Sequence, residues 1–168
     1  PRPIRNRTQV RFHSGTSEIL GNLILLDRDE LAPGEIAFAQ LRLEAPAALV
    51  AGDRFVIRSY SPIRTIGGGA VTNPIPAKHK RFRESVIGHL AERAKAGPMD
   101  AVEGYIRDAG YGGRSLAHLR VMTNLPEKAL ESALQDLASR QRVIQTDRER
   151  RVYVHGDPFQ ALVESIAD

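Results

Sequence analysis

The stretch GDRFVIRSYSPIRTIGGGAVTNP, residues 52–74, decides the fold of this chain. It predicts a strand, a turn at Ser61-Pro62, and a second strand that breaks on three consecutive glycines, residues 67–69. Glycine weakens a strand and packs nothing, so it usually marks a bulge or the close approach of another backbone. Because Arg58 and Arg64 flank the hairpin, a phosphate chain is a candidate for that approaching backbone.

Two well-known glycine-rich phosphate loops do not fit this stretch. A P-loop requires Lys followed by Ser or Thr after its last glycine, and a dinucleotide-binding loop requires a helix there. Here the glycines are followed by Ala70-Val71-Thr72, which predicts more strand, and then by Pro74. The glycines therefore belong to a β structure. They serve either as a bulge that closes it or as a contact surface, and both interpretations remain open.

The rest of residues 8–73 also predicts β structure. Apolar and polar residues alternate through 9–13 and through 39–44, which is the period of half-buried strands. Residues 19–26 are apolar on both faces, and residues 32–35 have Pro and Gly where a type II turn requires them. Five strands at this spacing predict a small barrel or sandwich, and the apolar outer patch fits a closed barrel covered by a neighbouring domain.

Residues 5–76 resemble the third, β-barrel domain of the bacterial selenocysteine-specific elongation factors, the SelB family of translational GTPases. Domains of this elongation-factor Tu type close with a Phe-x-Ile/Leu-Arg strand, a short turn and an Arg-Thr-Val/Ile-Gly-x-Gly strand. Three further segments, 10–18, 31–35 and 39–43, narrow the resemblance to the selenocysteine-specific branch. The positions that fit the closing hairpin are Phe55, Ile57, Arg58, Arg64, Thr65, Ile66, Gly67 and Gly69.

The resemblance implies an elongation-factor Tu C-terminal-like β barrel over residues 1–73, from which the first strand of the family is missing. In that family this edge of the barrel meets the acceptor and T stems of tRNA. His13 is a further candidate from its place in the segment 13–16. The positions to which tRNA binding carries over are Arg58, Arg64, Thr65, Gly67, Gly68 and Gly69.

After residue 73 the pattern changes from strands to helices. Pro74-Ile75-Pro76 predicts a stiff linker over residues 74–78. Apolar residues then recur at helical spacing over about 79–96, from 98 to 110 and from 126 to 138, and alternate again around a polar loop at 146–150. This order predicts an α+β winged-helix domain over 79–156. Residues 157–168 predict the start of a second winged-helix module or a C-terminal helix.

Two basic groups in this second part are candidates for contact with RNA phosphates. Cations oppose the helix dipole at an N-terminus, so the first group favours an anionic partner, although a salt bridge from the barrel would serve equally. The helix that would read DNA is nearly neutral on its exposed positions, whereas base readout requires cations and amides. A spacer that packs against protein is the alternative for this domain. The two groups are Lys78, Lys80, Arg81 and Arg83, and then Arg148, Arg150 and Arg151.

Composition sets broad limits on function. The 168 residues carry 24 basic and 20 acidic side chains, and a net charge of +4 is compatible with nucleic acid without demanding it. With no cysteine there is no disulfide framework and no thiolate metal site. No apolar run approaches the roughly 20 residues that span a bilayer, and no signal-peptide pattern opens the chain. These features favour a cytoplasmic protein without a membrane partner, and Pro1 indicates a fragment or a processed product.

No catalytic or metal-binding pattern stands out in the sequence. The five histidines have no metal-ligand spacing, and no His-Glu-x-x-His pair or nucleophile elbow occurs. Asp27, Asp29 and Glu30 lie beside a turn and Arg28, which indicates a solvated loop. We therefore expect no catalytic residue, no metal site and no cofactor in this chain.

Two hypotheses from different classes follow. In the first, the chain is a fragment of a selenocysteine-specific elongation factor, which delivers selenocysteinyl-tRNA to the ribosome. The resemblance then implies an upstream GTPase domain that binds GTP and magnesium, and downstream domains that hold an mRNA hairpin; the fragment itself is not an enzyme. The alternative is a DNA-binding transcription regulator with a winged helix and a β sensor domain. A basic recognition helix would have favoured this alternative, and the chain lacks one.

Overall fold

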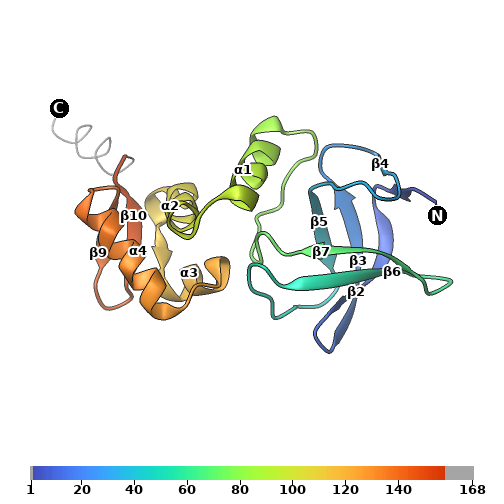
Figure 1. Cartoon of the computed structure of the whole chain (residues 1–168), viewed down its shortest axis with the longest axis horizontal. Helices are drawn as coiled ribbons and strands as arrows, with labels where there is room; N and C mark the ends of the chain where they lie inside the picture. The colour runs from blue at the N-terminus through green and yellow to red at the C-terminus, as the bar shows by residue number, and fades with distance from the viewer. Residues whose placement is uncertain (1, 158–168) are drawn as a thin grey trace. The chain divides into compact units, whose positions relative to one another are not determined.

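The computed structural model describes residues 2–157, and internal contacts divide the chain into two compact units, Pro1–Ala94 and Lys95–Asp168 (Figure 1). The division falls later than the predicted linker at 74–78, because the segment that follows the prolines is hydrogen-bonded to the first unit. The module predicted at 157–168 lies, apart from Asp157, outside the described residues.

The first unit is built on an antiparallel sheet of five strands, in the order β5-β3-β2-β6-β7 (Figure 1). A short ribbon of β1 (Ile4–Arg5) and β4 (Glu30–Leu31) lies beside it in the same unit. The five strands are β2 (Thr8–Ser14), β3 (Ser17–Leu25), β5 (Ala39–Leu43), β6 (Arg54–Ser59) and β7 (Thr65–Ala70).

The predicted closed barrel is not found among the described residues. Strands β5 and β7 lie at the two ends of the strand order, and no ladder of hydrogen bonds joins them in residues 2–157. The unit is therefore barrel-like but open between these two edges. The expectation that one more strand belongs to this barrel stays a prediction.

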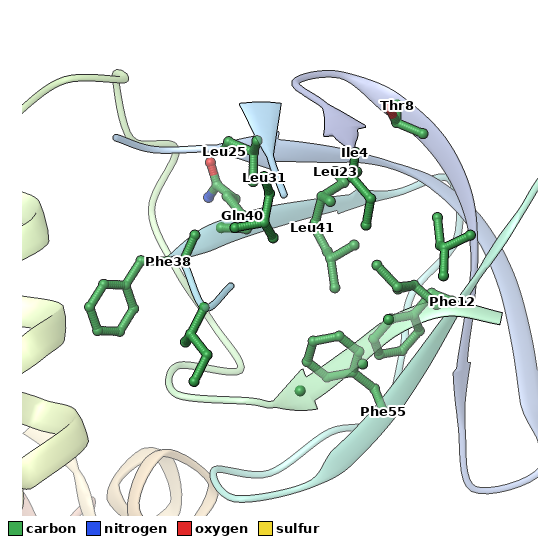
Figure 2. Close-up of a pocket in the computed structure, with 18 of the residues that line it drawn as sticks. Ile4, Thr8, Phe12, Leu23, Leu25, Leu31, Phe38, Gln40, Leu41 and Phe55 are labelled. Atoms are coloured by element: carbon green, nitrogen blue, oxygen red, sulfur yellow. The ribbon is translucent and has the colours of Figure 1, made fainter. Parts of the chain in front are cut away.

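The inner face of the sheet is apolar, because side chains alternate between the two faces of each strand. Val10 and Phe12 of β2 are buried there with Leu23 and Leu25 of β3 and Ile57 of β6. Phe12, Leu23, Leu25 and Ile57 also line a hollow of about 1520 Å³. Phe12, Phe55, Leu23 and Leu41 project into this hollow (Figure 2). The residues that alternate with them along each strand, such as Arg11 on β2 and Arg58 on β6, therefore lie on the outer face.

The type II turn predicted at residues 32–35 is present. The amide of Glu35 donates to the carbonyl of Ala32 at 3.1 Å, and Gly34 has a φ of 84°. This left-handed conformation is the reason that the third position of such a turn favours glycine. The turn leads the chain from β4 towards β5.

Helix α1 (Glu84–Lys95) begins five residues later than the predicted start at 79. The preceding segment is held by the first unit: the side chain of Gln40 donates to the carbonyl of Ala77 at 3.0 Å. The amide of Phe82 donates to the carbonyl of Leu26 at 2.7 Å, and Phe82 has a φ of 57°. Residues with this φ cannot continue a right-handed helix, so α1 starts only beyond them.

The second unit combines helices with a small antiparallel sheet (Figure 1), whose strand order is β8-β10-β9. The helices predicted from Pro98 and Pro126 and the alternating strand segments are confirmed, and their apolar faces form one core around Ile106, Leu119, Leu130 and Leu134. The elements are α2 (Pro98–Asp108), a 3-10 turn at Gly110–Gly112, β8 (Arg114–Ser115), α3 (Leu116–Thr123), α4 (Glu127–Ser139), β9 (Val143–Asp147) and β10 (Val152–His155).

One polar cluster lies within this second unit. His155 is buried, and its Nε2 lies 3.1 Å from Oε1 of Glu103 on α2. Burial alone would raise the pKa of Glu103, but the hydrogen bonds from His155 and Arg142 outweigh it and lower the pKa below its ordinary value. The amide of Asp157 donates to Nδ1 of His155 at 3.3 Å. Both ring nitrogens are thus satisfied, which fits a packing role for this histidine.

Candidate nucleic-acid interface

The hairpin of β6 and β7 carries most of the residues that the sequence singled out. Val56 is paired with Gly68, Ile57 with Gly67 and Phe55 with Gly69. Residues directly opposite in an antiparallel pair place their side chains on the same face. Gly68 therefore lies on the outer face with Val56, whereas Gly67 and Gly69 lie on the inner face above Ile57 and Phe55.

The expectation that β7 breaks at the glycines is wrong. Strand β7 runs through all three glycines to Ala70, and the irregularity in its pairing precedes them. Ile57 is paired with Gly67 but Arg58 with Thr65, so Ile66 is an extra residue, as in a β-bulge. Ile66 is partly buried against the apolar core of the unit.

A Cβ atom at each glycine would meet a different neighbour. At Gly68 it would lie 2.6 Å from the carbonyl oxygen of Phe55, a backbone atom that cannot easily move. At Gly69 it would lie 2.9 Å from the ring of Phe55, and at Gly67 no closer than 3.5 Å to Ile57. The backbone that approaches Gly68 is therefore that of the neighbouring strand, which supports a structural role for this glycine.

The outer face of β2 and β6 is rich in cations. Arg11 on β2 is directly opposite Arg58 on β6, and His13 follows two residues later on the same face. Arg54 and Arg58 are exposed, and the side chain of Arg58 makes no hydrogen bond or ion pair within residues 2–157. Like charges directly opposite each other destabilise a sheet, so this pair is costly unless an anion compensates it.

Arg11 has two neighbours that hold its guanidinium on this face. Its Nη1 donates to Oε1 of Glu18 at 2.5 Å, and its charged carbon lies 5.4 Å from the centre of the Tyr60 ring. The hydrogen bond from Arg11 lowers the pKa of Glu18, and the charges of Arg11, His13 and Arg58 act in the same direction against desolvation. Glu18 is therefore a carboxylate at neutral pH. The Nε of Arg11 and the Nε2 of His13 are buried and have no hydrogen-bond partner.

Arg64 and Thr65 stand at the end of the hairpin turn and are both exposed. The turn is fixed by Ser59, whose hydroxyl accepts from the amide of Arg64 at 3.1 Å and whose amide donates to the carbonyl of Arg64 at 2.8 Å. Thr65 is paired with Arg58. The structure thus brings Arg58, Thr65, Gly68 and His13 to one face, with Arg64 in the adjoining turn.

The basic group 78–83 precedes helix α1 and is not in its first turn, which instead contains Glu84. Arg81 is occupied by the first unit: its Nε donates to the carbonyl of Leu25 at 2.7 Å, and it pairs with Asp29 at 2.7 Å. This is the salt bridge from the barrel that the sequence left open. Lys78, Lys80 and Arg83 are exposed.

The second basic group lies in the turn between β9 and β10 of the second unit. Arg148 and Arg150 are exposed there, whereas Arg151 pairs with Glu131 of α4 at 2.7 Å. Arg140, which directly follows α4, pairs with Asp136 of that helix at 3.0 Å. The cations beside α4 are therefore partly neutralised within the unit.

The described part of the chain offers no metal centre or membrane span. Residues 2–157 contain no group of three or more His, Asp or Glu side chains that would hold a metal ion. In the same range no helix is long and apolar enough to cross a membrane.

Arg11 and Arg54 were not identified as site residues from the sequence. The signal was present, because Arg11 alternates with buried Val10 and Phe12, and Arg54 lies two and four residues from Val56 and Arg58. Only the pairing of β2 with β6 shows that these positions share a face. Alternation in the sequence predicts which residues of one strand share a face. The register between strands is needed to predict which residues of different strands share that face.

Comparison with known proteins gives two matches. Residues 1–78 match the family model described as the β-barrel domain of selenocysteine-specific elongation factors. The chain is also 39% identical over 162 residues to a selenocysteine-specific elongation factor of Desulfomicrobium baculatum. That alignment covers 96% of this chain but 25% of the relative, so the chain spans about a quarter of the length of the protein it matches. The hairpin motif, the matched β domain and the alignment through both units agree, and together they support a fragment of a selenocysteine-specific elongation factor.

Proposed function

We propose that this chain is the part of a selenocysteine-specific elongation factor that receives a stem of selenocysteinyl-tRNA during delivery to the ribosome. The outer face of β2, β6 and β7 is the surface on which the RNA backbone lies. One observation carries this proposal: Arg11 and Arg58 are directly opposite each other on the outer face, and Glu18 hydrogen-bonds Arg11 but not Arg58, so a phosphate would relieve the remaining repulsion. Double-stranded RNA is bound mainly through its shape and its phosphates, which suits a face whose cations are arginines.

The second unit has the role of a winged helix that links the barrel to the mRNA-binding end of the whole protein. The order of one helix, a short strand, two helices and a two-stranded ribbon supports this assignment. Arg148 and Arg150 are the cations that remain open for RNA phosphates in its wing. Apart from these proposed RNA contacts, the unit serves as a spacer between the barrel and the mRNA-binding end.

A DNA-binding transcription regulator is less well supported. The helix α4 would enter the major groove, yet Arg140 and Arg151 beside it are engaged by Asp136 and Glu131. Specific DNA binding requires cations and amides that are free to meet phosphates and base edges. The β unit also shows a basic outer face, which a sensor domain does not need.

Guanine nucleotide and magnesium do not fit this chain, although the whole protein of this family would bind them. The sequence contains no Gly-x-x-x-x-Gly-Lys-Ser/Thr loop. We expect GTP or GDP with magnesium, at about a hundred times the Kd of the full-length factor for the nucleotide, to leave the melting temperature of the 168-residue chain unchanged. Specific binding at 100 times Kd would stabilise the chain by about 2.7 kcal/mol. A nucleotide-dependent rise of several degrees would contradict this expectation.

Amide hydrogen exchange tests the location of the tRNA surface. In the full-length elongation factor, aminoacyl-tRNA should slow exchange in the β6–β7 hairpin and in β2, because ordered RNA excludes water from this face. The edge strand β5 of the same sheet provides the internal control and should exchange unchanged. Protection at β5 with none at β6 and β7 would place the RNA elsewhere on the unit.

A further inference from the structure

Glu18 holds an unusual position on the outer face. Among the five strands of the sheet as described here, it is the single carboxylate. Glu18 is paired with His13 of β2. Arg11 lies two residues from His13 on the same strand and is paired with Arg58 of β6. Three basic side chains therefore converge on one acid.

The contacts of Glu18 use both of its oxygens. Oε1 accepts from Nη1 of Arg11 at 2.5 Å, and Oε2 lies 3.5 Å from Nε2 of His13. Arg58 makes no hydrogen bond to Glu18, but its positive charge contributes to lowering the pKa of Glu18. A carboxylate that bridges two bases in this way has the geometry and charge of two oxygens of a phosphodiester.

Some hydrogen-bond donors of the same cluster have no acceptor. Nε of Arg11 has no hydrogen-bond partner, Nε2 of His13 lies near Glu18 at 3.5 Å without a hydrogen bond, and the guanidinium of Arg58 makes no ion pair in the described residues. Buried donors are seldom left unpaired in native proteins, and an exception is explained by strain, by function or by a partner that is absent. A single carboxylate cannot satisfy all of these donors.

We propose that Glu18 is an internal mimic of a phosphate, which occupies Arg11 and His13 in the free protein and yields them to the backbone of a double-stranded RNA stem. This inference rests on the proposed function of the outer face. In the complex, Arg11 and Arg58 hold neighbouring phosphate oxygens, and Glu18 returns to solvent. Glu18 thus limits affinity and keeps the opposed arginines compensated while the protein carries no RNA.

Replacing Glu18 by glutamine tests the inference, because Glu18→Gln keeps the size and one acceptor oxygen but removes the charge. The probe is a hairpin RNA with the acceptor and T stems of tRNA, bound to the full-length protein. We expect up to about fivefold tighter binding near 0.1 M salt, because RNA no longer has to break the partly exposed ion pair between Glu18 and Arg11. The slope of log K against log salt should also steepen by up to about one unit, because Arg11 then releases a counterion without Glu18 taking one up.

Two further variants make the test decisive. Glu44→Gln removes an exposed carboxylate next to β5 on the same sheet and should change affinity by much less, which separates a local effect from net charge. Arg11→Ala should weaken binding more in the Glu18→Gln protein than in the wild type, because Arg11 is fully available only there.

The outcomes separate this inference from the proposed function. Equal or weaker RNA binding by Glu18→Gln with an unchanged melting temperature, or no effect of Arg11→Ala in either background, would overturn the phosphate mimic. If Arg58→Ala also left RNA affinity unchanged, the face would not bind RNA at all and the proposed function would fail with it. Tighter binding by Glu18→Gln and Glu44→Gln alike would show a net-charge effect and would equally overturn the mimic.

Discussion

Replacing Gly68 by alanine should destabilise the β6–β7 hairpin by about 1–3 kcal/mol, the usual cost of forcing an extra carbon into a packed site. The new Cβ would lie 2.6 Å from the carbonyl oxygen of Phe55, and relief requires the strands to separate. The free energy of opening, measured from exchange of the β6 and β7 amides, should fall by that amount.

Gly67 provides the matched control one residue away. Its Cβ would meet only Ile57 and Ile4, at 3.5 Å or more, which is ordinary packing. Gly67→Ala should leave the hairpin as stable or stabilise it by up to about 1 kcal/mol, because alanine restricts the unfolded chain. Equal destabilisation by both substitutions would show that the assignment of the two glycines to opposite faces is wrong.

The glycine result also decides how RNA binding is to be tested. A bulky residue at position 68 disturbs the pairing of β6 with β7, so weaker tRNA binding by such a variant would not identify a contact. The glycines were equally consistent with a structural role and with RNA contact from the sequence. The distance to Phe55 favours the structural role for Gly68, whereas contact with RNA stays a prediction.

Much of the architecture could be predicted from periodicity. The strands around Val10 and Phe12 and the helix with Leu130 and Leu134 follow patterns of two and of three to four residues. Local turn chemistry was equally informative, since Pro and Gly at 33 and 34 gave the observed type II turn. These features depend on neighbours in the sequence.

Features that depend on distant residues could not be predicted. Arg81 was grouped with the open cations of the 78–83 segment, yet it is held by Leu25 and Asp29, more than fifty residues away. The late start of α1 follows from the bond between Phe82 and Leu26. Helical periodicity does not report such tertiary competition for the backbone, so the helix was extended to residue 79.

The candidate site shows the same division. Arg58, Arg64 and His13 were identified from motifs, but Arg11 and Glu18 became visible only through the register of β2 with β3 and β6. A sheet assembles its functional face from strands that lie far apart in the sequence. The sequence motifs therefore identified residues on single strands of the face, but not the residues of neighbouring strands that lie beside them.

The second large effect is expected from the arginines of the hairpin. In the full-length elongation factor, the double variant Arg58→Ala/Arg64→Ala should weaken binding of aminoacyl-tRNA by one to two orders of magnitude at about 0.1 M salt, because two phosphate contacts are lost. Both side chains are exposed and Arg58 makes no ion pair in residues 2–157, so the melting temperature should be unchanged. Arg107→Ala, an exposed arginine on α2 of the second unit, is the matched control.

The salt dependence of tRNA binding tests the central claim most directly, because it counts phosphate contacts. Each contact contributes about 0.7–0.9 to the slope of log K against log salt, so the double variant should lose between one and two units of slope. Arg107→Ala should keep the slope of the wild type. If Arg58→Ala/Arg64→Ala has the same slope and affinity as the wild type, the outer face of β2, β6 and β7 does not bind the RNA backbone.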